Sequence, residues 1–443
     1  MKRSASGEKL RAMPSRKTIA ILYHARGTYP LRSAVETHLL AWQRHSTHHT
    51  LYINAAMTDP VRALEAARPD CIVVHTSFCG LRWNKEEFQR LSGAIDQIGR
   101  MDALKIALPQ DEYYLTAQLK ALMTRLGVTV ILSCAEQDNW EKLYGELTRQ
   151  VTFETVLTGY LDEVVIRKAR RWSLPLKARS IFLSYRAWDT GFWLGEHGVH
   201  KVRVGEAMRT ALEHRGIQSD ISMVASDTIT GGEWLRFLGR SRATIGVEGG
   251  ASLIDADGSI KACVDAYITD NPDATLHEVR ESCFPADSGG FKLACLSPRH
   301  LEAIATGTVQ ALVRGRYNGI LEADRHYIPI EPDYSNLDDV IDTLKDDAQV
   351  QTITQTAWDD IVASGRYTYA ALVSAIDAAY VTSTPNQARG AYWPVRRWLK
   401  LRDWINWRII QMECFYLDNP RLFRPFAWLL RPIYCRLVPT RNS

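Results

Sequence analysis

A single carboxylate stands in a short and otherwise apolar segment of the sequence. The segment "SPRHLEAIATGT" covers residues 297–308 and contains Glu302. Ser297 suits an N-cap, Pro298 the first helical position and Gly307 the residue after a helix. We expect a short helix whose N-terminus can bind phosphate, with a carboxylate that can accept hydrogen bonds from vicinal hydroxyls such as those of a ribose. A solvent-facing Glu that complements the helix dipole is the alternative.

Other residues with useful chemistry stand in or after apolar runs. They are Gly27 and Thr28, His75, Asp111 and Glu112, and Glu248 with Gly249 and Gly250. A carboxylate or His at such a place can deprotonate a hydroxyl, so His75, Asp111, Glu112 and Glu248 are the catalytic candidates. Each has a structural alternative, because a lone His is more often part of the packing and a loop Glu often caps a turn. Asp255 and Asp257 form "DAD", which we interpret as loop acids, so no metal site is expected.

Strand-like and helix-like segments alternate along the chain and must position these residues. The strand-like runs are 18–24, 49–54, 71–78, 104–110 and 128–134, and then 179–187, 243–252 and the run after Gly307. Amphipathic stretches such as 204–216 and 331–347 separate them. Nearly continuous apolar strands between helices are typical of parallel, doubly wound sheets, whose ligands bind outside the carboxyl ends of the strands.

The fold class that follows is α/β, with two Rossmann-like domains facing a cleft. The expected parts are a disordered basic head (1–17), an N-terminal domain (18–162), a charged linker (163–178), a C-terminal domain (179–380) and a helical tail (381–443). Residues 255–292, rich in Asp, Gly and Pro, are expected to form an irregular insertion.

Composition limits the class of protein. The chain has 443 residues, of which 46% are hydrophobic and 23% charged, as in ordinary globular proteins. Its eight cysteines show no metal-ligand spacing, and we expect reduced, mostly buried thiols. The sequence shows no signal peptide and no apolar run long enough to span a membrane, so a cytoplasmic location is expected.

The tail differs from the rest in charge and aromatic content. Residues 391–443 contain ten Lys or Arg, three acids and five of the thirteen Trp. Trp mixed with Arg is typical of an interfacial segment, which could attach the protein peripherally to the anionic inner face of a membrane. A tail that packs back onto the first domain is the alternative. No nucleic-acid partner is expected, because the basic residues are not joined to a nucleic-acid fold.

Several segments together resemble one family. "SPRHLEAIATGTVQAL", "IALPQDEYY", "VLTGY", "GGEWLRFLGRSRATIGVEGGASLIDADGSI", "RYNGILEADRHYIPIEPDYSNLDDVID" and "SGRYTY" resemble, in order and spacing, GT-B glycosyltransferases of the group 1 type. Within that family they are similar to bacterial surface-polysaccharide glycosyltransferase-like proteins. The resemblance covers roughly residues 18–380.

The resemblance implies a function and roles for particular residues. It implies transfer of a sugar from a nucleoside-diphosphate sugar to a glycan or lipid-linked acceptor, in surface polysaccharide synthesis, without a metal or cofactor. The implied donor-binding residues are Glu302 for the ribose, Arg186 and Lys201 for the diphosphate, Glu248, Gly249 and Gly250 for the sugar, and Ser297 and Arg299 beside them. The implied acceptor-side groups, among them Gly27 and Thr28, would lie in the first domain and the donor-side groups in the second. The sequence departs from many members at Ala294, where they have a second Glu.

Two other interpretations stay open. "IFLSYRAWDTG", with the helix-like stretch up to residue 217, resembles the opening of a TIR domain, a signalling module that in some proteins cleaves NAD. That resemblance leaves the preceding strand-helix series and Glu302 without a role. Ala294 also leaves open a catalytically inactive, nucleotide-binding protein of the GT-B kind.

Overall fold

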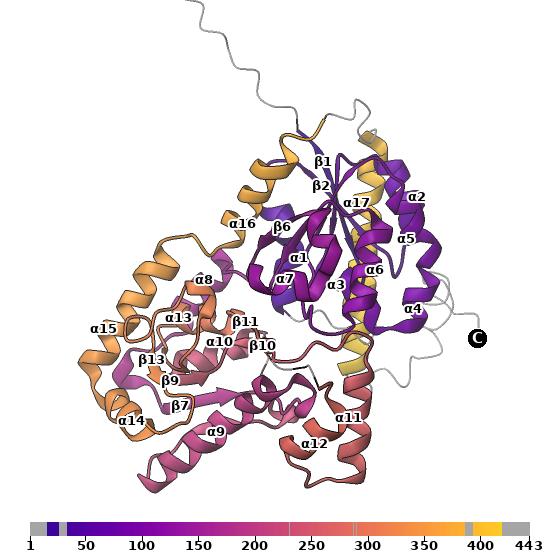
Figure 1. The fold of residues 1–443 in the computed structure, drawn as a ribbon. Helices are drawn as coiled ribbons and strands as arrows, with labels where there is room; N and C mark the ends of the chain where they lie inside the picture. Colours follow the sequence, from indigo (N-terminus) through magenta and orange to yellow (C-terminus); the bar gives the residue numbers. More distant parts are fainter. Residues whose placement is uncertain are drawn as a thin grey trace, which may run out of the picture.

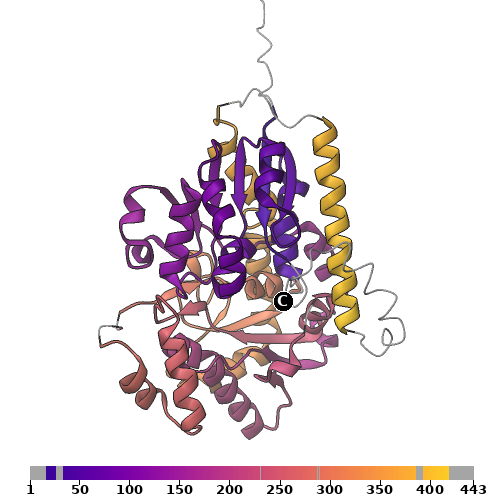
Figure 2. The ribbon, with the colours of Figure 1, turned by 90° about the vertical axis from the view of Figure 1, so that its right-hand side faces the viewer.

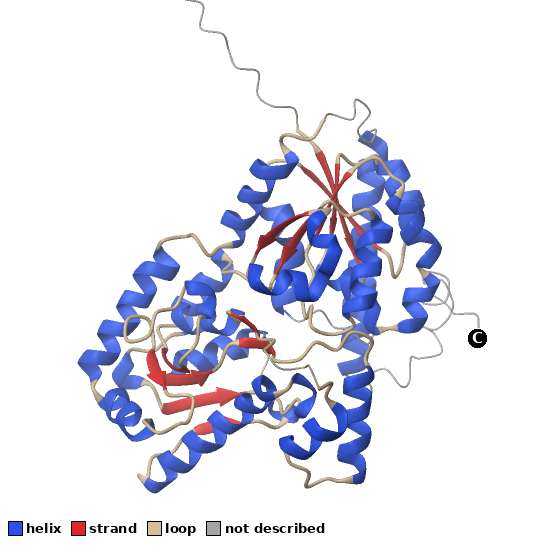
Figure 3. Ribbon diagram, in the orientation of Figure 1, coloured by secondary structure: helices blue, strands red, loops and turns tan. Residues whose placement is uncertain are grey.

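The computed structural model describes most of the chain as two α/β domains with an additional helix at the C-terminal end (Figure 1; Figure 3). The described residues are 16–25, 33–229, 231–286, 288, 290–385 and 393–418. Most of the basic head, the candidates Gly27 and Thr28, and the tail beyond 418 lie outside this set. Among the described residues, no helix is both long and apolar enough to cross a bilayer.

The first domain is built on a six-stranded parallel sheet in the order β2-β1-β3-β4-β5-β6. Its strands are β1 Thr18–Tyr23, β2 His49–Asn54, β3 Cys71–Val74, β4 Leu104–Ala107, β5 Val130–Ser133 and β6 Thr152–Thr155. Its helices are α1 Ser33–His45, α2 Pro60–Ala67, α3 Thr76–Cys79, α4 Lys85–Arg90, α5 Ser92–Gly99, α6 Thr116–Leu126 and α7 Gln137–Tyr144. The middle strands β1, β3 and β5 are wholly buried, as expected for apolar strands covered on both faces.

The second domain has a five-stranded parallel sheet in the order β13-β12-β9-β7-β8. Its strands are β7 Ile181–Arg186, β8 Asp220–Ser222, β9 Ser241–Gly246, β12 Val309–Val313 and β13 Ile328–Ile330. Its main helices are α9 Glu196–His214, α10 Gly231–Arg240, α13 Pro298–Ala305, α14 Leu337–Lys345 and α15 Asp347–Ala357. The connection between the domains is itself helical, since α8 spans Glu163–Trp172.

The insertion is more regular than its composition suggested. Helices α11 (Ser259–Asp270) and α12 (Leu276–Cys283) form a hairpin within it. Thr275 and Glu278 make a capping box at the start of α12, a signal that the sequence "TLHE" already carried. Cys263 and Cys283 form a disulfide across the hairpin, so the expectation of eight reduced thiols is wrong for this pair. The expectation failed because an irregular loop gives no reason to place the two residues together.

The chain returns to the first domain at its C-terminal end. Helix α16 (Tyr369–Ile376) packs against α1, and its apolar residues join the core that also contains β1 and β3. Helix α17 (Trp393–Asp418) then runs along β2 and α2 on one flank of the same domain (Figure 2). Residues placed by sequence in the second domain and in the tail therefore complete the first domain.

Candidate active site between the two sheets

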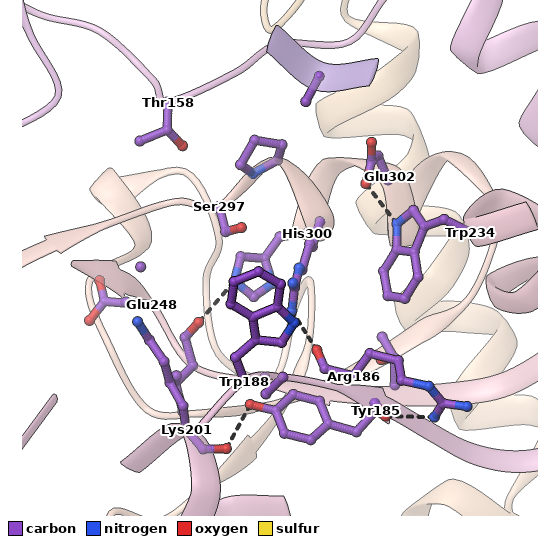
Figure 4. A pocket seen from close by; sticks show the side chains of 18 of the residues that line it. Thr158, Tyr185, Arg186, Trp188, Lys201, Trp234, Glu248, Ser297, His300 and Glu302 are labelled. Atoms are coloured by element: carbon purple, nitrogen blue, oxygen red, sulfur yellow. Dashed lines mark hydrogen bonds between the residues drawn. The ribbon is translucent and has the colours of Figure 1, made fainter. Parts of the chain in front are cut away.

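A cavity of about 510 Å³ lies between the carboxyl ends of the two sheets (Figure 4). The first domain contributes Ala34, Asp111, Tyr113 and Thr158, and the second domain contributes the rest of the wall. Ligand pockets commonly enclose about 300 to 1,000 Å³, and they form at this edge in doubly wound folds. The cavity is therefore large enough for a ligand of the size of a nucleotide sugar.

Glu302 lies in the cavity wall on α13. Its Oε2 accepts a hydrogen bond from Trp234 Nε1 at 2.8 Å, and Trp234 comes from α10 on the neighbouring side of the wall. Burial raises the pKa of Glu302 to about 7, against the lowering effects of this hydrogen bond and of Arg299. Ser297 occupies the N-cap position of α13 without a hydrogen bond from its side chain to the helix, so the first N–H groups keep their capacity for a ligand.

Three cations stand around the cavity, and they differ in what already binds them. The guanidinium of Arg186 donates to Asp220 Oδ1 at 2.7 Å and to backbone carbonyls, which turns it toward β8. The guanidinium of Arg299 lies 5.7 Å from the ring centre of Trp234 and donates to the Arg186 carbonyl. The Lys201 ammonium makes no hydrogen bond or ion pair with the described residues, and burial lowers its pKa.

This distribution changes which cations suit a diphosphate. Four of the five N–H donors of the Arg186 guanidinium are engaged by Asp220 and by backbone oxygens, so it has little capacity left for a diphosphate, and its role on the donor stays a prediction. Lys201 and Arg299 retain donors that a phosphate can use. Figure 4 shows Lys201 and Glu248 on one side of the cavity and Glu302 and Trp234 on the other.

Glu248 lines the cavity, but its carboxylate is occupied. One oxygen accepts the Tyr317 backbone N–H at 2.7 Å, and the other lies 3.7 Å from Lys292 Nζ. This is the turn-capping role that the sequence left open beside a catalytic one. Glu248 and the two glycines that follow it all lie in the cavity wall.

The glycines after Glu248 form a narrow ribbon. Gly249 and Gly250 lie in β10 (Gly249–Ala251), which pairs antiparallel with β11 (Leu293–Cys295) and brings Gly250 opposite Ala294. Gly250 has φ +121°, and a Cβ there would lie 2.0 Å from the Leu293 carbonyl oxygen. Only glycine fits this position.

Asp111 projects from the first domain into the same cavity. It follows β4 with φ +49°, a left-handed conformation that is uncommon outside glycine. Its Oδ1 accepts from the Tyr113 hydroxyl at 3.1 Å, and its charge acts on Lys201 across the cleft. Strained backbone of this kind is often found where a side chain is aimed at a ligand.

Glu112 and His75 do not belong to the cavity, and their assignment as catalytic candidates is corrected. Glu112 is buried inside the first domain, where its carboxylate accepts from Ser133, Tyr144 and the Cys134 N–H. His75 is fully buried too. Its Nε2 lies 2.8 Å from a nitrogen of the equally buried His38. The predicted strand 71–78 ends at Val74, so His75 caps α3 rather than lining the cleft.

The aromatic residues of the cavity wall were not predicted from the sequence. Trp188 follows β7 and donates from Nε1 to Thr228 Oγ1 at 2.6 Å, and Trp234 donates to Glu302. A neutral His300 supports the floor through Gln310, because burial lowers its pKa to about 4. The available signals were Trp188, directly after the predicted strand 179–187, and Trp234 in "GGEW".

The part of the chain that the structure describes contains no group of three or more His, Cys, Asp or Glu side chains that could hold a metal ion. Asp255 caps α11 with its carboxylate, which accepts the N–H groups of Gly258 and Lys261.

The two domains facing this cavity define the GT-B fold. No family model matches the sequence, and no curated protein matches it. Solved structures of alpha-glucosyltransferase match the fold. The complex with UDP is 10% identical, covers 83% of this chain and 100% of that chain, and has a TM-score of 0.51. The complex with UDP-glucose and DNA containing an abasic site is 11% identical over the same shares, also with a TM-score of 0.51.

Another solved structure, Anabaena HepE with UDP-glucose, has a TM-score of 0.43 at 12% identity and covers 83% of this chain and 100% of that chain. The alpha-glucosyltransferase complex with UDP-glucose contains DNA. The expectation of no nucleic-acid partner is therefore wrong. It assumed that basic residues need a dedicated nucleic-acid fold, whereas alpha-glucosyltransferase, a structure with the same two-domain fold, is bound to DNA.

Proposed function

We propose that the protein is a glycosyltransferase that uses a nucleoside-diphosphate sugar. One observation carries the proposal: Glu302 and Lys201 stand on opposite sides of a cavity at the carboxyl ends of both sheets. A carboxylate suits the hydroxyls of a ribose, and an unpaired ammonium suits the phosphates that follow it in a nucleotide sugar. The fold shared with alpha-glucosyltransferase supports the same function.

In this proposal each part of the donor contacts a different part of the cavity wall. The ribose lies at Glu302 and Trp234, and the diphosphate lies between Arg299, Lys201 and the N-terminus of α13. The sugar then points toward Asp111 of the first domain and the backbone at Glu248. Fixed cations stabilise the charge that develops on the leaving nucleoside diphosphate.

Asp111 is the residue that we propose to face the acceptor. It comes from the other domain, it lies in the cavity wall, and its carboxylate keeps one oxygen without a hydrogen bond to the described residues. A carboxylate so placed can accept the proton of an acceptor hydroxyl or hold that hydroxyl in line with the sugar. Closure of the two domains would exclude water from the reaction.

The acceptor that we propose first is a glycan or a lipid-linked saccharide in surface polysaccharide synthesis. The protein would act there while attached to the inner face of a membrane. The resemblance of the motifs between 18 and 380 to surface-polysaccharide enzymes supports it.

DNA is the second candidate acceptor. The DNA-bound alpha-glucosyltransferase supports it. So does the outer face of α8, where Arg167, Lys168 and Arg171 are exposed and make no ion pair with the described residues. Mobility shift of duplex DNA, with and without the substitutions Arg167→Glu and Arg171→Glu, separates the candidates. A salt-sensitive shift that the double variant loses favours DNA.

The donor proposal is tested by incubating the purified protein with a panel of nucleoside-diphosphate sugars and measuring release of the nucleoside diphosphate. We expect one base and one sugar to be preferred. We expect Lys201→Met to reduce release at least about a hundredfold, since loss of one group that stabilises developing charge has an effect of that order. Equal release by Lys201→Met and wild type would refute the role of Lys201.

A further inference from the structure

Helix α17 carries an exposed apolar face that nothing in the described structure covers. Trp398, Leu401, Trp404, Ile405 and Met412 are exposed, with Trp404 at 56% and Met412 at 63%. Spacings of three, four and seven residues place them on one side of the helix. Contiguous exposed apolar surface of this kind marks an interaction site more often than single exposed residues do.

The opposite face of α17 holds the helix firmly on the first domain. Leu399, Asn406 and Ile410 are buried against it. The Tyr23 hydroxyl donates to Asp403 Oδ1 at 2.8 Å, and Asn406 Nδ2 donates to Thr58 Oγ1 at 3.1 Å. The exposed face is thus displayed on a folded domain, along the flank visible in Figure 2.

Cations lie among and beside these apolar residues. Arg397, Lys400 and Arg408 are exposed, and no acidic side chain lies on the exposed side of α17 between residues 394 and 412. The guanidinium of Arg402 lies 5.0 Å from the ring centre of Trp398, and that of Arg408 lies 5.5 Å from the ring centre of Trp404. Asp403, the acid within this stretch, faces inward to Tyr23.

We propose that this face of α17 binds an anionic lipid bilayer surface. A bilayer interface accepts apolar side chains and indole rings at the depth of the headgroups, while the arginines beside them meet lipid phosphates. Nucleic acid would use the cations but gains little from Leu401, Ile405 and Met412. A second copy of the chain would bring Arg397 and Arg408 against like charges or against apolar surface.

The bilayer surface deepens the proposed function, because it would hold the first domain where lipid-linked acceptors are found. This role in reaching acceptors rests on the proposed sugar transfer, but binding to lipid does not. Vesicle binding is measured without donor or acceptor, so loss of the proposed function and loss of this inference are distinguishable.

The test is sedimentation of the full chain with two kinds of vesicle, one of phosphatidylcholine and one in which phosphatidylglycerol replaces part of it. We expect binding to the anionic vesicles that weakens with salt, and little binding to the neutral ones. The double substitution Trp398→Ser and Trp404→Ser should weaken partitioning at least about tenfold, because it removes the two largest apolar side chains of the face. The double substitution Arg397→Gln and Arg408→Gln should weaken binding to anionic vesicles alone.

The matched control is Trp83→Ser, which removes another exposed Trp, at 41%, from the first domain. It should bind vesicles as the wild type does. The proposal would be overturned if the wild type did not bind vesicles. It would also be overturned if the Trp398→Ser and Trp404→Ser variant bound them as tightly as the wild type, because the contact would then lie elsewhere, for example in residues 419–443. A wild-type dimer that this variant converts to a monomer would overturn it in favour of a second copy. Melting temperatures check that every variant is folded.

Discussion

At the scale of single residues, Glu302 is the group whose environment is most informative. Its carboxyl lies in the cavity wall with one hydrogen bond, from Trp234, and burial raises its pKa to about 7. The ordinary value in an unfolded chain is about 4.3. Because the folded-state pKa is the higher of the two, the folded protein holds the proton more tightly. Stability from this group is full below about pH 4.3 and is lost as the pH rises to about 7.

This shift predicts a pH dependence of two quantities. Nucleotide affinity should increase from about pH 6 to about pH 8, because the carboxylate accepts hydrogen bonds from both ribose hydroxyls and the neutral acid does not. Glu302→Gln should remove that increase, and above pH 7 it should raise the free energy of unfolding, because the neutral amide avoids the cost of burying a charge. Calorimetric titration and chemical denaturation at several pH values measure both. An affinity that stays flat in the wild type would contradict the role of Glu302.

Asp111 and Glu112 are neighbours with opposite expected effects. Asp111→Asn should lower the transfer rate without changing the melting temperature, since Asn tolerates the left-handed backbone and Asp111 faces the cavity. Glu112→Ala should do the reverse: it leaves the donors of Ser133, Tyr144 and Cys134 unpaired, at about 3 kcal/mol or more of stability. Turnover and thermal unfolding of both variants are the measurements. A stable, inactive Glu112→Ala protein would show that the buried carboxylate has another function.

At the scale of elements, the β10–β11 ribbon fixes the side of the cavity near the proposed sugar position. Gly250→Ala should separate this pair, because the new Cβ would meet the Leu293 carbonyl oxygen at 2.0 Å. We expect a melting temperature lower by several degrees and weaker donor binding.

The control for this substitution is Gly93→Ala on α5, where a Cβ meets nothing within 4 Å. It should be neutral or slightly stabilising, since Ala is the better helix former. If Gly250→Ala binds the donor as tightly as Gly93→Ala does, the ribbon has no part in the site.

Most elements were predictable because their signals are local. The run 49–54 and the α13 segment, with Pro298 and Gly307 at its ends, followed from propensity and patterning alone. β6 (Thr152–Thr155) was not predicted, because it is a polar edge strand and its residue pattern is typical of a loop. The partners of side chains were not predictable at all. That Asp220 occupies Arg186 and that Tyr317 occupies Glu248 depends on residues 34 and 69 positions apart.

At the scale of the whole molecule, the α11–α12 hairpin links the second domain to the first. Asp255, at its base, accepts the Leu115 N–H with its backbone oxygen and donates to the Tyr113 carbonyl. Tyr113 follows Asp111 by two residues and lies in the cavity wall, so this contact reaches the cavity. The hairpin therefore ties the insertion to the loop that carries the proposed acceptor residue.

Asp255→Ala should loosen that tie. Its carboxylate accepts the N–H groups of Gly258 and Lys261 at the start of α11, and loss of such a cap costs about 1–2 kcal/mol. We expect a lower melting temperature and a higher KM for the acceptor, with donor affinity unchanged. Asp257→Ala is the exposed control two residues away. Equal effects of the two substitutions would contradict a specific tie between the domains.

The central claim is that the cavity between the sheets binds a nucleoside diphosphate through Glu302 and Lys201. Calorimetric titration of the protein with UDP, GDP, ADP, CDP and dTDP tests it most directly. We expect one preferred nucleotide, at least about tenfold weaker binding by Glu302→Gln at pH 8 and by Lys201→Met, and unchanged binding by His75→Gln, provided that variant is folded. The proposal would be contradicted if no nucleotide bound the wild type, or if Glu302→Gln and Lys201→Met bound the nucleotide as tightly as the wild type does.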